Sequence, residues 1–376
     1  MNQVKSINIH NFRTARENMG LSTLVASKKI SASKKDLVLE WENGFSLPTW
    51  PQITRLSKVY NVPELILLSN KNISENKKIP DYRIGVEDKT SQDIKKLINL
   101  VLKRQVWLEQ KFKSEGLPKN NIQGSGRYIN SPSKLSAFIS KKLDIDFQEF
   151  KDISGYSSGK EALKYLIKKA ESRGIFVGKT VSHHNIKVDN MRGLFISNDY
   201  CPYIILNRKD AISAQIFSFI HELAHLFRKS EGVSNTLEFR EINPNIDKEE
   251  VFCNRVAAEL LLPETEFDKE FYTKQDIDNL SDVYKLSKIF IFYRLKDLKR
   301  IRKESQNILE IQIKQETDEN IARNKNKKKS GGNSLNNMKD SNGSLFNKVV
   351  SGSYLEEKTG YVEASRLLGF PVDKYE

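Results

Sequence analysis

Cysteine, long apolar runs and an apolar start are all scarce or absent in this chain of 376 residues. Only two cysteines occur, which is too few for a disulfide framework and indicates a reducing compartment. No apolar run approaches the roughly eighteen residues that a membrane span needs. The start, MNQVKSINIHNFR, also lacks the apolar stretch of an export signal. We therefore expect a cytoplasmic protein that has no membrane partner.

Basic residues outnumber acidic ones, with 62 Lys and Arg against 48 Asp and Glu and a formal net charge of +14. Such a surplus favours attraction to polyanions such as nucleic acid. A lysine-rich composition also occurs in proteins that never bind nucleic acid, so charge alone leaves the partner open. The length is too great for one ordinary compact core, and it indicates two or three folded units joined by linkers.

Hydrophobic periodicity predicts where the helices and strands lie. Short runs with apolar positions three and four apart over residues 8–70 predict a compact module of short helices. One long amphipathic helix is predicted over residues 91–116. Three β-branched or aromatic runs, GIFVGK, GLFISND and YIILN, are typical of strands in a small sheet, and helices precede and follow them. The fold class that we expect is therefore α+β.

Composition changes sharply in the last quarter of the chain. The stretch ARNKNKKKSGGNSLNNMKDSNGS is rich in Lys, Asn, Gly and Ser and is expected to bury too little apolar surface to fold. We therefore expect five regions, namely a helical domain, a helical linker, a mixed domain with the sheet, a flexible basic linker and a C-terminal helical segment. Their predicted bounds are 1–75, 76–130, 131–305, 306–342 and 343–376.

Two of the five histidines lie four residues apart in the apolar stretch FIHELAHLF, residues 219–227. On an α-helix this spacing directs His221 and His225 to one point, where they can chelate a metal ion. Glu222 lies about 100° round the helix, within reach of a metal-bound water. Satisfied core histidines are the alternative, but the pattern arises by chance in on the order of one in a few hundred chains of this composition. The pattern favours a metal site with Glu222 as general base.

A catalytic zinc ion needs a third protein ligand. The downstream candidates are Glu231, Glu238, Glu241, Glu249, Glu250 and Glu259. The stretch DKEEVFCNRVAAELLLP predicts a second helix that ends before a proline. Glu250 and Asn254 lie one turn apart on one side of this helix, and Glu259 lies roughly opposite Glu250. The geometry favours one end of the helix for the third ligand, but it does not separate Glu249 from Glu250.

These motifs resemble the ImmA/IrrE family of metallopeptidases. The similarity runs, in the family's order, through GIFV, RGLFISND, PYIILN, IHELAHLF and EVFCNRVAAELLLP. The resemblance implies a zincin-like fold and a Zn²⁺ site held by His221, His225 and Glu250. It also makes Glu222 the base and places Asn254 beside the ligands.

The activity implied by the resemblance is zinc-dependent endopeptidase cleavage of a regulatory protein, such as a repressor or an antitoxin, that controls gene expression. We expect the strand YIILN, which precedes the histidine helix, to offer an edge to an extended substrate segment. The alternative is a non-proteolytic DNA-binding regulator or antitoxin that uses the zincin-like fold as a scaffold or sensor. The presence of Glu222 favours the hydrolase, because a scaffold has no need of a base.

The N-terminal module resembles the lambda-repressor-like, or XRE-type, helix-turn-helix domain. The stretch WENGFSLPT carries residues where that family has its Trp-Glu-x-Gly and Pro-Thr signature. The resemblance implies binding of double-stranded DNA, with Ser33, Lys34 and Lys35 available for contact near the third helix. Lysines suit phosphates better than base edges. A module that binds protein, or that only helps the chain to fold, is therefore the alternative.

Overall fold

A computed structural model describes residues 3–4, 6–19, 21–31, 36–60, 62–70, 89–156, 159–181, 186–230, 232–234, 248–325 and 333–375. The chain divides into two compact units, and the division falls inside a long helix, α6 (Lys89–Ser114), after Leu102. The first unit holds the N-terminal helices, and the second holds the sheet and both histidines of the metal motif. No helix in the described parts of the chain is long and apolar enough to cross a membrane.

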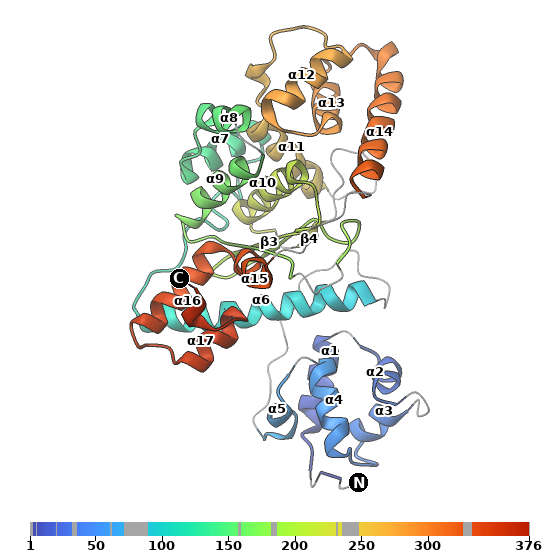
Figure 1. The fold of residues 1–376 in the computed structure, drawn as a ribbon, viewed down its shortest axis with the longest axis vertical. Coiled ribbons are helices and arrows are strands. Elements are labelled where there is room, and N and C mark those ends of the chain that lie inside the picture. Colours follow the sequence, from blue (N-terminus) through green and yellow to red (C-terminus); the bar gives the residue numbers. More distant parts are fainter. Residues whose placement is uncertain are drawn as a thin grey trace. The chain divides into compact units, whose positions relative to one another are not determined.

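The first unit is the module of short helices that the periodicity predicts (Figure 1). Its helices are α1 (Ile9–Asn18), α2 (Thr23–Ile30), α3 (Leu37–Glu42), α4 (Trp50–Tyr60) and α5 (Glu64–Leu68). They share one core, in which the Trp41 side chain is buried. The Arg16 guanidinium donates to the buried Glu42 carboxylate at 2.7 Å, which joins α1 to α3. Ser27 Oγ accepts the Val38 amide at 2.9 Å and joins α2 to α3.

The second unit places helices before, between and after its strands, as expected for an α+β fold (Figure 1). The predicted long helix is confirmed as α6, which is followed by α7 (Pro132–Leu143), α8 (Phe147–Tyr156) and α9 (Gly159–Glu171). The Gln105 amide on α6 donates to the carbonyl oxygens of Ile196 and Cys201, both at 3.0 Å. These bonds fix the turn that joins two strands of the sheet.

The sheet has the order β1-β3-β2-β4 in the described residues. Its strands are β1 (Phe176–Lys179), β2 (Gly193–Ile196), β3 (Tyr203–Leu206) and β4 (Gly232–Ser234), and the first three are the predicted ones. β3 pairs in parallel with β1 and antiparallel with β2, while β4 pairs antiparallel with β2. The expectation that YIILN offers a free edge is therefore wrong, because every residue of β3 is paired on both sides.

Successive side chains of a strand point to opposite faces of the sheet, and burial of both faces explains why the strands are apolar throughout. Val177 and Ile204 belong to the main core with the helices α9 and α10. Phe176 and Tyr203 belong to the opposite face, where their rings stack with centroids 5.6 Å apart. Both faces are therefore covered, so neither needs the polar residues of a solvated sheet surface.

Two helices carry the candidate site, and three more complete the core. α10 (Ile212–Arg228) packs on β2 and β3, and α11 (Lys248–Leu261) packs on α10 and α7. The following helices are α12 (Lys274–Tyr284), α13 (Lys288–Asp297) and α14 (Lys303–Lys325). α13 contacts both α12 and α14.

The C-terminal region differs from the sequence-based expectation. Residues 306–342 were expected to be a flexible linker, yet α14 continues to Lys325 and α15 (Ser334–Asn342) fills the end of this region. The helices α16 (Ser344–Leu355) and α17 (Tyr361–Leu368) follow. Both α15 and α16 pack on β1.

Buried hydrogen bonds explain why a segment with so little apolar surface is ordered. The fully buried Asn342 amide donates to Asn347 Oδ1 at 2.9 Å and to the Leu368 carbonyl at 2.8 Å. Its own carbonyl accepts the Tyr203 hydroxyl at 2.9 Å, and its side-chain oxygen accepts Arg104. Losing such partners in a buried position is costly, so the polar residues anchor α15 where apolar area does not.

Candidate metal centre

The helix α10 brings the two histidines into the interior. Fourteen successive residues of α10, from Ala214 to Phe227, are buried, because the sheet lies on one side of the helix and α7, α9 and α11 cover the rest. The helix ends at Arg228, and the next residue, Lys229, adopts a left-handed φ of 60°. The exposed fractions of His221, Glu222 and His225 are only 2%, 0% and 5%. Imidazoles and a carboxylate so deep in an apolar helix require polar partners.

Glu250 on α11 completes a group of three ligand side chains. His221 Nε2 and His225 Nε2 lie 2.9 Å apart. The Glu250 carboxylate lies 3.4 Å from each ring, with Oε2 towards His221 and Oε1 towards His225. The structure therefore brings together the two histidines and one of the six downstream carboxylates that the sequence offers.

The geometry and chemistry of this group fit a divalent metal ion. Ligand atoms about 2.0–2.1 Å from a tetrahedral ion lie roughly 3.3 Å from one another, close to the 2.9 and 3.4 Å found here. Two imidazole nitrogens that face each other at such a distance can share only one proton, so they are suited to hold a cation in common. Two neutral nitrogens and one carboxylate are also a ligand set that zinc accepts while leaving a fourth position for water.

Glu249 and Glu250, which sequence geometry could not separate, have different partners. Glu249 receives two hydrogen bonds from the Arg228 guanidinium, at 2.9 and 3.0 Å, and one from Ser230 at 3.3 Å. Its carboxylate thus ties the end of α10 to the start of α11. Glu250, the next residue, turns to the histidines.

Burial and the close contacts set the protonation of this group. Burial lowers the pKa of His221, which keeps the ring neutral and therefore able to bind a metal. Burial acts to raise the pKa of Glu250, but hydrogen bonds from His221 and His225 outweigh it and hold that pKa well below its usual range. A neutral imidazole and an ionised carboxylate are the forms in which His221 and Glu250 act as ligands.

Glu222 lies against β2 at a position where the strand has no side chain. A methyl group on Gly193 would lie 2.5 Å from Glu222 Oε1 and 2.8 Å from its Cγ. The glycine therefore provides the space that the carboxylate occupies. Nothing in the sequence pattern assigns this role to Gly193, because β2 and α10 meet only in the folded chain.

Two further residues support the ligands. Ser230 Oγ lies 2.8 Å from His225 Nδ1, so that a Glu249–Ser230–His225 chain orients the ring from behind. Ser230 follows the helix end and carries no sequence signal. Asn254, one turn beyond Glu250, is buried and lies close enough to His221 to act on the pKa of its ring.

Other polar residues in the region have structural partners. The Tyr203 hydroxyl is buried and donates to the Asn342 carbonyl. Arg192 forms an ion pair with Asp210 at 2.8 Å. Glu259 pairs with Arg294, away from the histidines.

The predicted DNA contacts, Ser33, Lys34 and Lys35, lie outside the described residues. The helices that flank them, α2 and α3, are both present in the first unit.

Comparison with known proteins places the candidate site in a recognised type of domain. No curated protein matches the chain, and no solved structure matches it. Residues 177–296 match the peptidase family model described as IrrE N-terminal-like domain. This segment contains the histidines, Glu222 and Glu250, and the match supports a metallopeptidase-type domain of the ImmA/IrrE family within the second unit.

Proposed function

We propose that the second unit is a zinc-dependent endopeptidase of the zincin type. The observation that carries this proposal is the convergence of ligand atoms of His221, His225 and Glu250 within 4.8 Å of one another, from two helices that pack together. The family match over residues 177–296 supports it independently. In this proposal the three side chains hold Zn²⁺, and Glu222 acts as the general base.

The protein's own residues account for most of the proposed mechanism. When bound, Zn²⁺ supplies a Lewis acid for the scissile carbonyl and lowers the pKa of a nearby water towards about 7. Glu222 accepts the proton that this water gives up and returns it to the departing amine nitrogen. Because Glu222 is fully buried, its charge acts in a medium of low dielectric, where it interacts more strongly with the proton that it moves.

We further propose that the first unit is a helix-turn-helix domain that binds double-stranded DNA, and that the substrate is a cytoplasmic repressor or antitoxin. The order of five short helices and the formal charge of +14 support DNA binding. Peptidases of the family that the chain resembles act on regulatory proteins, which supports the substrate class.

The competing proposal is a non-proteolytic regulator or antitoxin in which the metal site is a scaffold or sensor. A structural zinc site is closed by four protein ligands, whereas a catalytic site keeps one position open. The described residues offer three ligand side chains and a buried glutamate beside them. This arrangement favours the hydrolase.

The test of the peptidase proposal is cleavage of repressor-like proteins encoded next to the gene. Wild type is compared with Glu222→Gln and with Glu270→Gln, a control that makes the same chemical change at an exposed position. We expect Glu222→Gln to keep stoichiometric zinc by elemental analysis and to lose about 10²–10⁴-fold in cleavage rate. The control should cleave like wild type. Equal processing by wild type and Glu222→Gln would remove the proposed base.

The DNA proposal is tested separately, by gel shift of the full chain on random DNA and on DNA from upstream of its own gene. Nonspecific complexes should disappear as salt is raised, because they rest on released counterions. A complex with the upstream DNA that persists at raised salt is the expected result. Equal loss on both DNAs would leave the module without operator specificity.

A further inference from the structure

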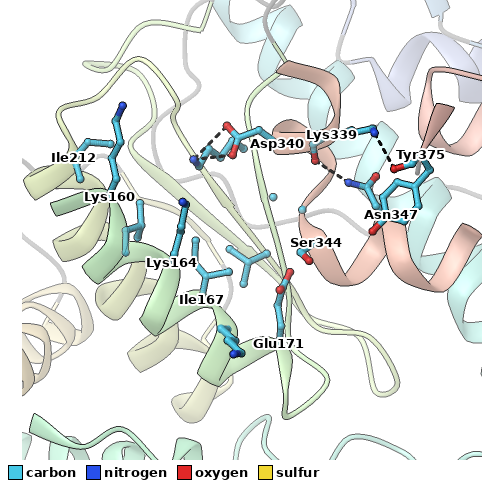
Figure 2. Close-up of a pocket in the computed structure, with 16 residues that line it drawn as sticks. Lys160, Lys164, Ile167, Glu171, Ile212, Lys339, Asp340, Ser344, Asn347 and Tyr375 are labelled. Atoms are coloured by element: carbon cyan, nitrogen blue, oxygen red, sulfur yellow. Dashed lines mark hydrogen bonds and ion pairs between the residues drawn. The ribbon is translucent and has the colours of Figure 1, made fainter. Parts of the chain in front are cut away.

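A cavity lies apart from the histidines, between α9, β1 and the C-terminal helices. Its volume is about 760 Å³. Figure 2 shows Lys160 and Lys164 on one side and Lys339, Asn347 and Tyr375 on the other. Segments about two hundred residues apart in the sequence thus enclose it. This volume is within the range of about 300–1,000 Å³ that small-molecule sites occupy.

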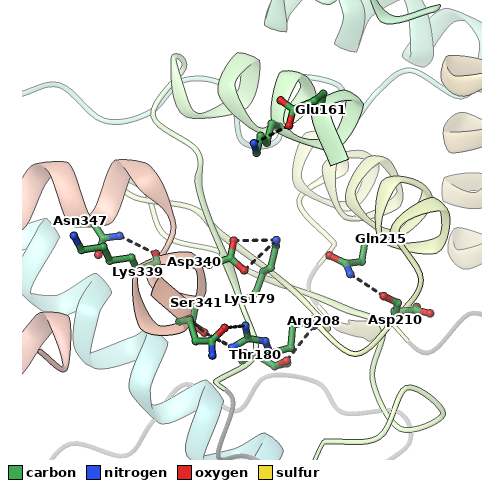
Figure 3. A network of polar contacts seen from close by, with 12 residues as sticks. Glu161, Lys179, Thr180, Arg208, Asp210, Gln215, Lys339, Asp340, Ser341 and Asn347 are labelled. Carbon is green, nitrogen blue, oxygen red and sulfur yellow. Dashed lines mark hydrogen bonds and ion pairs between the residues drawn. The ribbon is translucent and has the colours of Figure 1, made fainter. Parts of the chain in front are cut away.

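The charged residues that line the cavity are mostly basic, with five lysines against two carboxylates. Lys179 on β1 is already paired with Asp340 on α15, at 3.0 and 3.2 Å (Figure 3). Lys339 donates to the Tyr375 carbonyl at 2.8 Å and lies over the Tyr375 ring. These two lysines serve the docking of the C-terminal segment.

The other three lysines form a stripe along α9. Lys160, Lys164 and Lys168 are four residues apart, so their side chains leave the helix on one face at intervals of about 6 Å. All three are exposed, and Lys164 pairs with Glu161 at 2.8 Å. Within the described chain, Lys160 and Lys168 have no acidic partner. Lys160 and Lys168, which have no acidic partner among the described residues, and Lys164, which has one exposed ion pair, therefore face the cavity.

The second carboxylate of the cavity is used by the fold. Glu171, at the end of α9, accepts the Leu345 amide at 2.9 Å in the first turn of α16. It therefore satisfies one of the free amides at that helix end and does not neutralise the lysine stripe. The positive charge of α9 remains available to a ligand.

The uncharged lining is apolar along α9 and β1, whereas the C-terminal side contributes Ser344, Asn347 and Tyr375. The apolar side chains that line it are Leu163, Ile167, Val177 and Ile212, the first residue of the histidine helix α10. A site of this composition offers charge to an anionic group and apolar surface to an organic body. Compact lysine ammoniums bind phosphate oxygens as point charges.

We propose that this cavity binds a small organic polyphosphate of the nucleotide class. The phosphates contact Lys160, Lys164 and Lys168, and the organic part lies against the apolar wall. A nucleic acid is a less suitable ligand, because the C-terminal helices wall the cavity opposite the stripe. The site is independent of the proposed peptidase activity, since none of the zinc-site residues lines it.

The test is calorimetric titration of the full-length protein with ATP, inorganic triphosphate and adenosine, in the presence of Mg²⁺. ATP is expected to bind and adenosine is not. The triphosphate arm shows whether the phosphates alone are sufficient. Binding should weaken as salt is raised. Absence of binding by both ATP and triphosphate would overturn the proposal.

A matched pair of double variants assigns the binding to this cavity. Lys160→Gln with Lys168→Gln removes the two unpartnered cations, and Lys134→Gln with Lys141→Gln makes the same charge change on the exposed face of α7. We expect the double variant of Lys160 and Lys168 to weaken ATP binding at least about tenfold and the double variant of Lys134 and Lys141 to leave it unchanged. Equal weakening in both double variants would show a nonspecific charge effect and overturn the assignment of the site. Circular dichroism confirms that both variants are folded.

Discussion

The contact between Gly193 and Glu222 gives a sharp prediction for the variant Gly193→Ala. The added methyl would lie 2.5 Å from Glu222 Oε1, 2.8 Å from Cγ and 3.0 Å from Cδ, whereas ordinary van der Waals contacts begin at 3.4 Å. The carboxylate must therefore retreat by roughly 1 Å, and a displacement of this size costs about 100-fold in rate. Overpacking should also lower the free energy of unfolding by about 1–3 kcal/mol.

The assay measures zinc content, thermal unfolding and substrate cleavage on the same preparations. Gly193→Ala should keep its zinc, since the three atoms nearest to the methyl all belong to Glu222 and none to a ligand, and should cleave about 100-fold more slowly than wild type. Gly352→Ala is the control, because a methyl there meets nothing within 4 Å. If the unfolding temperature and the cleavage rate of Gly193→Ala equalled those of wild type, then Gly193 would not provide the space for Glu222, and the reasoning would fail.

Three further predictions concern the ligands, a helix cap and the C-terminal segment. Glu250→Gln should lose stoichiometric zinc by elemental analysis. Glu249→Gln should weaken zinc binding only about tenfold, because Glu249 acts on the ligand His225 through a hydrogen-bonded neighbour. Equal losses of zinc in both variants would contradict the assignment of Glu250 as the third ligand. Hydrogen bonds from Lys269 and from the start of α12 lower the pKa of Asp276 from 3.8 to about 2. Since its folded-state pKa lies below the unfolded one, Asp276 stabilises the fold above pH 4 and loses this effect as the pH falls towards 2. Urea unfolding should therefore show wild type losing about 1 kcal/mol more than Asp276→Asn over that range, after allowance for solvent screening; parallel pH profiles would contradict it. Gly343→Ala should make the C-terminal helices susceptible to trypsin cleavage, because Gly343 has a φ of +85° and its methyl would overlap a carbonyl of β1. Gly360→Ala is the control, because a methyl there has open space around it, and this variant should stay resistant to trypsin. Equal resistance of both variants would refute the predicted clash.

Local sequence patterns were sufficient for those parts of the site that lie within one helix. The spacing of His221 and His225 fixes their common direction on any α-helix, so the pair could be predicted without the fold. The choice between Glu249 and Glu250 depends on how α11 is rotated about its axis against α10, and the contacts of Glu249 with Arg228 and of Glu250 with the histidines reveal it. No local sequence pattern predicts how α11 is rotated against α10.

Contacts between distant segments could not be predicted in the same way. Three strands were found from their apolar runs, yet the central place of β3 follows from pairing with β1 and β2. The helices at both ends of residues 306–342 were not predicted, because composition measures apolar area and not hydrogen bonds. Asn342 contributes almost nothing to hydrophobicity, but its buried amide binds three separate parts of the second unit.

The docked tail has a practical consequence for anyone who shortens this protein. α15 and α16 lie on β1, the outermost strand on that side of the sheet. A fragment cut after the peptidase segment would leave the backbone groups of β1 bare, and such an edge is a template for pairing with a neighbouring molecule. Insolubility of a trimmed fragment would then reflect the missing cover rather than a misfolded metal site.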